Sequence, residues 1–377
     1  MRVALLGPTY PYRGGISHYT TLLARAFARD HELHIVSFSR LYPGFLFPGA
    51  TQFDESAEAL RPPVEPERLL DSVNPITWRR TGQRLRDLRP ELLVVPWWHP
   101  FFGPSIGTAA RAARRGDAPK RIFLCHNVEP HEPTPANRWL AAYALGAADG
   151  FLVHAEAEVA RLRSRSGSRP IRVHPHPSYE FFSERRPSRE EARARIGAEG
   201  RVILFFGYVR GYKGLADLLE ALKIARPDAW DRLYVVGEFY EPRARYEAAL
   251  RDPAIARKTT VVDRYVANEE VATYFAAADV VALPYRSATG SGIAQVAFGA
   301  GVPVIATRAG GLEEVVEDHV SGLLVEPSDP AGLARAIERF FGEELGPRLR
   351  EGVERARHRF TWEALVRALL SLKEECR

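Results

Sequence analysis

Two cations lie close together in a glycine-rich turn of the second half of the sequence. Residues 206–214 read FGYVRGYKG, so Arg210 and Lys213 stand between an apolar run and a helical pattern that begins at Gly214. Positive side chains beside the electropositive start of a helix are suited to hold a diphosphate. A solvated basic turn is the alternative. We favour an anion site because ligands of parallel α/β sheets bind beyond the carboxyl ends of strands, where this turn falls.

A second polar turn, YRSATGSG at residues 285–292, follows the apolar run 280–283. The hydroxyls of Thr289 and Ser291 and the backbone amides of Gly290 and Gly292 are suited to form a nest for an oxyanion at the start of a helix. Serine and threonine also favour the N-cap of any helix, so an ordinary cap is the alternative.

The first half of the sequence carries weaker signals. Gly14 and Gly15 precede a helical pattern, and paired glycines let a ligand approach backbone amides, although a plain strand-to-helix turn would look the same. His126 follows the apolar run 121–125, at a strand end where an imidazole is able to bind a sugar hydroxyl or move a proton. A structural histidine is the alternative there, and His174 and His176 are expected to be structural.

The two cysteines predict neither a metal site nor a disulfide framework. Cys125 follows an apolar run and is expected to be a buried thiol, whereas Cys376 is expected to be loosely held. We therefore expect no metal and no cofactor. The formal charge of +5 suits phosphate-bearing ligands or an anionic membrane, but base composition or heat adaptation explains the arginine content more simply. Nucleic acid is not an expected partner, because no RNA-binding or zinc-finger signature accompanies the charge.

Bulky aromatic residues gather in two predicted loops, YPGFLFP at 42–48 and WWHPFF at 97–102. Such loops fold into the core, line an acceptor site or touch a membrane interface, where Trp and Tyr are favoured. No apolar run approaches the ~20 residues that span a bilayer. The N-terminal residues resemble a first strand rather than a signal peptide. We expect a cytoplasmic protein, with peripheral contact to the inner face of the membrane as an open alternative.

The elements that must position these residues alternate between short apolar runs and longer helical patterns, which is typical of parallel α/β folds. In the first half, strands are expected at 2–6, 32–37, 92–96, 121–125 and 150–153, with helices at 16–29, 76–88, 104–115, 136–146 and 156–164. Strands are expected again at 202–206, 233–236, 259–262, 280–283 and 302–306, with helices at 214–224, 330–341 and 362–375. The length of 377 residues and the proline-rich segment 173–178 predict two domains in series.

The order and spacing of several stretches resemble the GT-B glycosyltransferases, specifically the large retaining group called glycosyl transferase group 1, or family four. The matching stretches are residues 14–15, 148–153, 206–214, 278–284, 301–307, 310–316 and 321–325. The resemblance implies two Rossmann-like doubly wound α/β domains facing across a cleft. The acceptor-side domain would span 1–177 and the nucleotide-sugar donor domain 178–359, and a last helix, 360–377, would pack back on the first domain.

The resemblance also implies a reaction: transfer of a hexosyl group from a nucleoside diphosphate sugar to a saccharide or lipid-linked acceptor, with retention, in polysaccharide or glycoconjugate synthesis. Catalysis would depend on His126 near the donor sugar and on Arg210 and Lys213 at the diphosphate. No metal would be needed, because cations and helix ends neutralise the leaving group. The other expected contacts are Gly14 and Gly15 with the transferring phosphate and the acceptor, and Arg264, Tyr265 and Val266 with the base, largely through the backbone.

The sequence departs from the family pattern at the donor-site arginine. That arginine usually follows the Phe-Gly pair directly, but here Tyr208 occupies the position and joins the expected donor contacts. Arg210 must then reach the phosphate from two residues further on.

The paired glutamates of the family are missing as well. Their positions correspond to Ala288 and Val296, and Thr289, Ser291 or Gln295 are candidates to take over. Two alternatives follow. One is a non-catalytic nucleotide-sugar-binding protein derived from a transferase. The other is another enzyme of the same fold, such as an NDP-sugar epimerase or a phosphorylase, which the missing acids and the lack of a well-placed late lysine disfavour.

Overall fold

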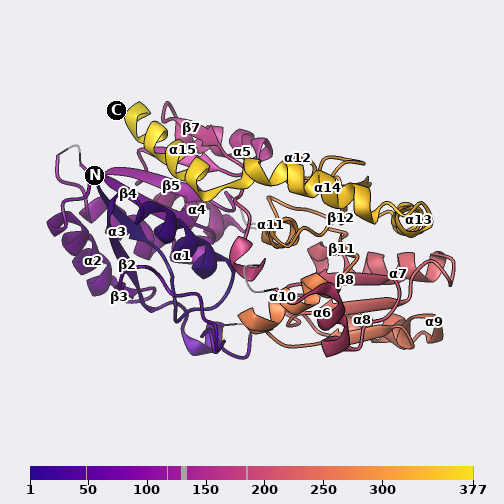
Figure 1. Cartoon of the computed structure of the whole chain (residues 1–377). Coiled ribbons are helices and arrows are strands. Elements are labelled where there is room, and N and C mark those ends of the chain that lie inside the picture. The colour runs from indigo at the N-terminus through magenta and orange to yellow at the C-terminus, as the bar shows by residue number, and fades with distance from the viewer. Residues whose placement is uncertain (48, 117, 129–133, 184–185, 377) are drawn as a thin grey trace. The chain divides into compact units, whose positions relative to one another are not determined.

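The computed structural model describes residues 1–47, 49–116, 118–128, 134–183 and 186–376. The chain divides into two compact units, each with its own parallel sheet and apolar core (Figure 1). Unit 1 comprises Met1–Glu55, Ala59–Pro175 and Thr361–Arg377, and unit 2 comprises Ser56–Glu58 and His176–Phe360.

Within the described part of unit 1, seven parallel strands form one sheet in the order β3-β2-β1-β4-β5-β6-β7. The chain moves outward from β1 to β3 and returns to the other side of β1 with β4. The topological switch point therefore lies between β1 and β4. The strands are β1 (Arg2–Leu6), β2 (Glu32–Arg40), β3 (Glu67–Asp71), β4 (Leu92–Trp97), β5 (Lys120–Cys125), β6 (Gly150–Val153) and β7 (Ile171–Val173).

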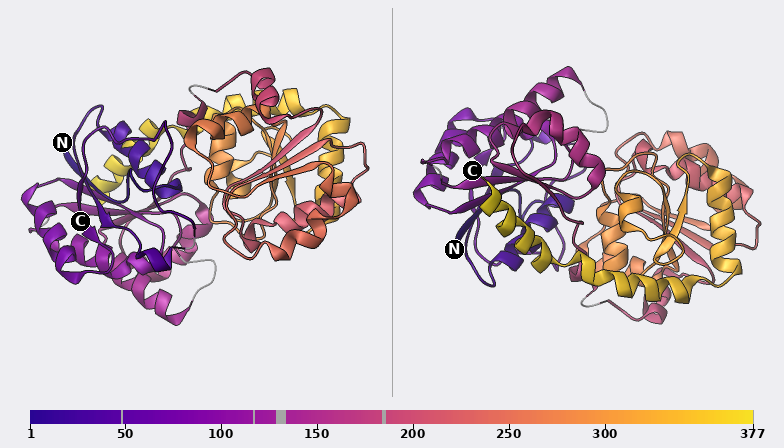
Figure 2. Two further views of the ribbon diagram at one scale, coloured as in Figure 1. Left: turned by 90° about the horizontal axis from the view of Figure 1, so that it is seen from below. Right: turned by 90° about the horizontal axis from the view of Figure 1, so that it is seen from above.

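Alternate side chains of these strands enter two cores on opposite faces of the sheet. Val3 and Leu5 belong to the core closed by α1 and α15, whereas Ala4 and Leu6 belong to the core closed by α2, α3, α4 and α5. Helices on both sides of the strands are visible in Figure 2. These helices are α1 (Gly15–Phe27), α2 (Pro75–Asp87), α3 (Gly103–Ala112), α4 (Pro135–Leu145), α5 (Glu156–Ser166) and α15 (Trp362–Glu375), with short 3-10 turns η1 (Gly44–Leu46) and η2 (Pro100–Phe102).

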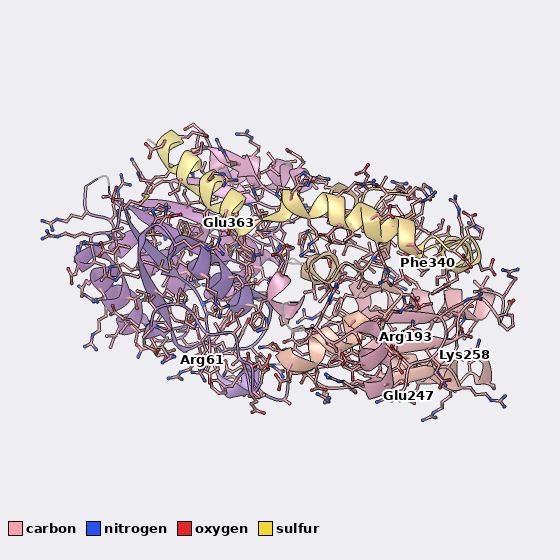
Figure 3. All side chains as sticks on the ribbon, in the orientation of Figure 1. Arg61, Arg193, Glu247, Lys258, Phe340 and Glu363 are labelled. Carbon is pink, nitrogen blue, oxygen red and sulfur yellow. The ribbon has the colours of Figure 1, made fainter. Side chains whose placement is uncertain are left out.

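The helix α15 follows all of unit 2 in the sequence and yet packs in unit 1, where it contacts α1, β5, β6 and β7. Thr361 caps its start, and Leu365 and Leu369 are fully buried on its inner face. Glu363, labelled on this helix in Figure 3, forms an ion pair with Arg29 of the segment after α1.

Unit 2 repeats the same winding. Its described residues form a sheet of six parallel strands in the order β10-β9-β8-β11-β12-β13, so the switch point lies between β8 and β11. The strands are β8 (Val202–Phe206), β9 (Arg232–Val236), β10 (Thr259–Val262), β11 (Val280–Leu283), β12 (Val304–Thr307) and β13 (Gly322–Val325).

A partly buried carboxylate ties the first helix of unit 2 to this sheet. Asp279 accepts a hydrogen bond from the Val202 amide at 2.8 Å and pairs with Arg189 and Arg193 of α6. The helices are α6 (Arg189–Ile196), α7 (Leu215–Ile224), α8 (Ala244–Leu250), α9 (Pro253–Ala256), α10 (Asn268–Ala277), α11 (Gly292–Gly299), α12 (Leu312–Val315), α13 (Pro330–Gly342) and α14 (Gly346–Ala356), with η3 (Glu180–Ser183), η4 (Gly211–Lys213) and η5 (Arg357–Phe360).

The expectation of two doubly wound α/β units is confirmed, and each expected strand has a counterpart. The expected burial of Cys125 is also confirmed. The expectation for Cys376 is wrong, because this residue is buried and its Sγ donates to the Leu372 carbonyl at 3.3 Å. Gly150 makes the room for it, since a Cβ there would lie 2.7 Å from the sulfur.

Candidate functional site

Two turns meet at the switch point of the unit 2 sheet, where the loops after β8 and β11 leave in different directions. The Arg286 amide donates to the Tyr212 carbonyl at 2.7 Å, which joins the turn after β11 to the turn after β8. Gly214 lies at φ +71°, and a Cβ at this residue would be 1.9 Å from the Pro284 carbonyl oxygen. Only glycine therefore permits this close contact between the two turns.

Lys213 is the central cation of this site. Its side chain is buried, with 8% of the residue exposed, and its Nζ lies 5.6 Å from the centre of the Tyr285 ring. Gly207, at φ +99°, leaves room for the ammonium, because a Cβ there would be 2.9 Å from Nζ. Burial, with the charge of Arg210 as the second cause, lowers the pKa of Lys213 to about 8. Among the described residues, no carboxylate forms an ion pair with this ammonium.

Arg210 lies on the exposed side of the same turn and rests on aromatic rings. Its guanidinium is 5.1 Å from the centre of the Tyr240 ring, and Tyr240 stacks on Tyr208 at 4.2 Å. Tyr265 lies 6.3 Å from Tyr208. We call these three residues, Tyr208, Tyr240 and Tyr265, the tyrosine cluster.

Backbone pairing between two loops explains why this cluster forms. The Val209 amide donates to the Glu238 carbonyl at 3.0 Å, and the Tyr240 amide donates to the Val209 carbonyl at 3.1 Å. This bridge extends the β8–β9 pairing beyond both strands. Val209 is fully buried, so its neighbours Tyr208 and Arg210 lie on the opposite face of the extended backbone, beside Tyr240.

The turn after β11 caps its own helix. Ser291 is the N-cap of α11, and its Oγ accepts a hydrogen bond from the Ala294 amide at 3.2 Å and donates to the Tyr285 hydroxyl at 3.3 Å. The Ser291 hydroxyl therefore forms an ordinary N-cap. Thr289 is buried, whereas Gly290 is exposed with no atom within 4 Å of where a Cβ would stand. The Gly290 backbone is therefore open to a ligand.

The two positions that correspond to the paired glutamates of the family hold apolar, buried residues. Ala288 and Val296 are both less than a tenth exposed. Gln295, on the next turn of α11 after Ser291, is fully buried, and neither its Oε1 nor its Nε2 has a hydrogen-bond partner among the described residues. An unsatisfied buried amide is costly, so this group stands out in the unit 2 core.

The segment expected at the nucleotide base follows β10. The guanidinium of Arg264 is engaged in a two-point ion pair with Glu270, at 2.9 and 2.6 Å. Tyr265 joins the tyrosine cluster, and Val266 is buried. Contact between Arg264 and a ligand would therefore involve its backbone or a rearranged ion pair.

The remaining expected residues belong to unit 1. Gly14 caps α1 at φ +101°, without a side-chain cap, and Gly15 has open space where a Cβ would stand. His126 is half-buried. Its ring lies 4.4 Å from that of Tyr19 in an edge-on arrangement and 5.3 Å from that of His154.

The two aromatic loops differ in exposure. Trp97 and Phe102 are fully buried, so the loop at 97–102 contributes to the core. In the loop at 42–48, Phe45 is 88% exposed and Leu46 is 49% exposed. Pro48, the last residue of that stretch, lies outside the described residues.

The structure thus brings together the unit 2 residues predicted from the two polar turns, and it adds two that sequence reasoning did not assign to the site, Tyr240 and Tyr285. Among the described residues, no group of three or more His, Cys, Asp or Glu side chains is placed to hold a metal ion. No described helix combines the length and hydropathy needed to cross a membrane.

Solved structures define the class of fold. The Anabaena HepE protein, solved in complex with UDP and glucose, superposes with a TM-score of 0.75 at 18% identity, over 98% of this chain and 99% of that one. The sucrose-phosphate synthase of Thermosynechococcus elongatus superposes with a TM-score of 0.73 at 21% identity, over 99% and 98%. The two units have the fold of the GT-B glycosyltransferases.

Sequence comparison then places the chain in a family. The family described as glycosyl transferases group 1 matches residues 200–343, and that described as glycosyltransferase family 4 matches residues 13–177. The D-inositol 3-phosphate glycosyltransferase of Acidothermus cellulolyticus is 31% identical over 314 residues, which are 76% of this chain and 69% of that protein. The chain belongs to the group 1 glycosyl transferases.

Other relatives match over different shares of their length. The D-inositol 3-phosphate glycosyltransferase 1 of Catenulispora acidiphila is 32% identical over 241 residues, which cover 60% of this chain and 57% of that protein. The matched region thus spans less than two thirds of this relative. The D-inositol 3-phosphate glycosyltransferase of Xylanimonas cellulosilytica is 28% identical over 387 aligned positions, which cover 95% of this chain and 91% of that protein.

Proposed function

We propose that this protein transfers a hexosyl group from a nucleoside diphosphate sugar to a saccharide or lipid-linked acceptor, with retention of configuration, in polysaccharide or glycoconjugate synthesis. We propose further that it works without a metal or cofactor, in the cytoplasm, and without a nucleic-acid partner. The donor would bind on the two turns at the switch point of unit 2. A UDP-sugar is the first candidate donor, because the similar HepE fold was solved with UDP and with UDP-glucose.

One observation carries the proposal: a buried lysine that no carboxylate of the described residues pairs with, at the switch point of a group 1 glycosyl transferase. Lys213 has lost most of its hydration, and its lowered pKa reflects that loss. An anion that binds there replaces the lost water contacts with a charge-assisted hydrogen bond. A diphosphate also fits Arg210, since the two cations lie on one short turn.

In the proposed reaction, the bond between the anomeric carbon and the donor phosphate oxygen breaks, and the nucleoside diphosphate leaves with the electron pair. A hydroxyl oxygen of the acceptor bonds to the anomeric carbon, and its proton passes to a phosphate oxygen or to solvent. Lys213, Arg210 and the open amides near Gly290 would stabilise the charge that develops on the leaving diphosphate, which is where electrostatic catalysis acts.

The roles of the unit 1 residues rest on the family resemblance. Gly14 and Gly15 would present open amides of α1 to the transferring phosphate and the acceptor, and His126 would approach the donor sugar. The imidazole ring of His126 makes an edge-on contact with the Tyr19 ring.

The test is a screen of UDP-, GDP- and dTDP-sugars for thermal stabilisation and for slow donor hydrolysis. A ligand at 100 times its dissociation constant stabilises a protein by about 2.7 kcal/mol, which a thermal shift detects. We expect one donor to give both responses in the wild type and neither in Lys213→Ala. The matched control is Lys223→Ala, which removes a lysine from the outer end of α7.

Stabilisation without hydrolysis in the wild type, persisting through a screen of saccharide and lipid-linked acceptors, would favour the non-catalytic binding protein instead. The apolar residues Ala288 and Val296 are the specific observation behind that alternative. No response to any nucleotide or nucleotide sugar would refute the donor site.

A further inference from the structure

A basic cavity lies in the outer helical layer of unit 1, away from every residue assigned above. It has a volume of about 370 Å³ and opens between α2, α3 and α4. Its polar lining comes from Arg79, Gln83 and Arg86 of α2, Thr108 and Arg111 of α3, and Tyr143 of α4.

Close helix packing shapes the floor of this cavity. Gly82 of α2 lies so near α3 that a Cβ would be 2.4 Å from that of Ala112. Gly107 of α3 lies so near α4 that a Cβ would be 2.9 Å from the Tyr143 ring. The three helices are therefore locked together by backbone contact, and the arginines project from a rigid base.

Arg111 supplies a fixed positive charge. Its guanidinium donates to the Gly107 carbonyl at 3.0 Å and to the Tyr143 carbonyl, and its Cζ lies 4.1 Å from the centre of the Tyr143 ring. These partners are all uncharged. Among the described residues, no carboxylate forms an ion pair with Arg111, Arg79 or Arg86. The cavity thus gathers three guanidinium groups that no carboxylate in the described part of the chain neutralises.

The three helices around this cavity are strongly basic. The helices α2, α3 and α4 carry six arginines and one aspartate, hence a formal charge of +5. The complete sequence has 52 basic and 47 acidic residues, also +5, so 46 of each sign remain elsewhere and cancel. A strongly positive face on an otherwise balanced chain indicates an anionic partner.

Two exposed aromatic side chains lie on α4, and one of them, Tyr143, lines the cavity. Trp139 of α4 is 79% exposed, and Tyr143, one helical turn later, is 43% exposed. Large exposed aromatic residues are unusual in water, whereas Trp and Tyr beside basic residues are favoured at the boundary between lipid headgroups and acyl chains.

We propose that the α2–α3–α4 face docks on an anionic phospholipid membrane. The cavity takes a headgroup phosphate between Arg79, Arg86 and Arg111, while Trp139 enters the headgroup layer. A guanidinium cluster matches phosphate oxygens in geometry as well as charge. The combination of arginines with an exposed indole is what favours a lipid surface over a soluble phosphate. This inference does not depend on the donor site, because its readout is binding to vesicles.

The test is co-sedimentation of the full chain with phosphatidylcholine vesicles, with and without phosphatidylglycerol. We expect binding only with phosphatidylglycerol and a decline of binding as salt is added. The double variant Arg79→Gln, Arg86→Gln should weaken binding about 30-fold, because each arginine near an anionic surface contributes about 1 kcal/mol. Trp139→Gln, which keeps every charge, should also weaken it.

The matched control is the double variant Arg348→Gln, Arg355→Gln. These exposed arginines of α14 have the same seven-residue spacing and lie in unit 2. Equal loss of binding in both double variants would overturn the proposal, since only net charge would then matter. A second result would also overturn the proposal: inorganic pyrophosphate stabilises the wild type but not the Arg79→Gln, Arg86→Gln variant, and the wild type binds no vesicles. The cavity would then bind a soluble anion. Absence of wild-type binding to phosphatidylglycerol vesicles would refute it outright.

Discussion

The charged ammonium of Lys213 is buried, so folding has removed most of its contact with water. Its pKa of about 8, against an ordinary value of 10.5, corresponds to about 3 kcal/mol of unfavourable burial at neutral pH. Such a cost persists at a site where an anionic ligand offsets it. Stability and ligand binding should therefore respond in opposite directions when this lysine is replaced.

We expect Lys213→Met to raise the free energy of unfolding at pH 7 by up to about 3 kcal/mol, because an apolar side chain fills the site without a buried charge. The same variant should lose the thermal response to the donor. Calorimetric unfolding with and without nucleotide sugar measures both effects. Lys223→Met, the control on α7, should keep the donor response, and a Lys213→Met protein that still responds would exclude this lysine from the site.

Donor affinity should depend on pH above neutrality. The native pKa is lower than the unfolded one, so below pH 8 the burial cost is fully present, and it is relieved as pH rises from about 8 to 10.5. A bound diphosphate favours the ammonium. We therefore expect affinity to be flat below pH 8 and to fall by up to about tenfold per pH unit above it. Titration calorimetry on the wild type should show this decline, and an equally steep decline in Lys213→Met would contradict the assignment.

Tyr240 should act through Arg210, whose guanidinium rests on its ring. Tyr240→Leu removes the cation–π contact, worth about 0.5–1 kcal/mol at an exposed position, and should weaken donor binding about two- to fivefold. Tyr240→Phe keeps the ring and should bind as the wild type does. In a double-mutant cycle, Tyr240→Leu should have no further effect once Arg210→Gln is present. Additive losses would show that Tyr240 acts independently of Arg210.

The sequence predicted Arg210 and Lys213 because both stand in one short turn after an apolar run. It did not predict Tyr240, which lies 30 positions after Arg210 and reaches it only through the backbone bridge between Val209 and Phe239. It did not predict the ion pair between Arg264 and Glu270 either, because that pair depends on how α10 leaves the preceding loop. Contacts that need tertiary structure were the ones missed.

At the scale of elements, the two turns of unit 2 depend on Gly214. We expect Gly214→Ala to cost about 1–3 kcal/mol of stability and to abolish donor binding, since φ is +71° and a Cβ would meet the Pro284 carbonyl oxygen at 1.9 Å. Chemical denaturation with and without donor measures both quantities. Gly342→Ala, at the end of α13 with no atom near a Cβ, is the neutral control. Normal donor affinity in Gly214→Ala would show that the junction of the turns is not needed.

The elements that the sequence predicted differ from those that it did not predict in the strength of their apolar pattern. The strand β8 is VILFF, covered on both faces, and its apolar run is unmistakable. The edge strand β3 is ERLLD and β7 has only three residues, so neither offers an apolar run of ordinary length. The helix α14 begins Gly-Pro and has five charged residues among eleven. Its four buried residues recur at helical spacing, but Gly352 and Ala356 are two of them, so the apolar stripe is weak.

At the scale of the whole molecule, unit 1 depends on a helix that follows all of unit 2 in the sequence. We expect Leu369→Ala to destabilise unit 1 by about 2–5 kcal/mol, because a fully buried leucine leaves a cavity between α15 and the sheet. Arg367→Ala, on the exposed side of the same helix, should change stability by less than about 0.5 kcal/mol. Denaturation curves compare the two, and equal effects would mean that α15 does not support the core.

The position of α15 in the sequence also determines the order in which translation completes the two units. Translation completes the strands and helices of unit 2 before the residues of α15 leave the ribosome, so unit 2 has all of its parts while one face of the unit 1 sheet still lacks a covering helix. Synthesis of unit 1 thus begins before that of unit 2 and is completed after it. Until then, the apolar side chains that will meet Leu365 and Leu369 are exposed to chaperones and to neighbouring nascent chains, and a ribosome that stalls before α15 would leave unit 2 complete and unit 1 unfinished.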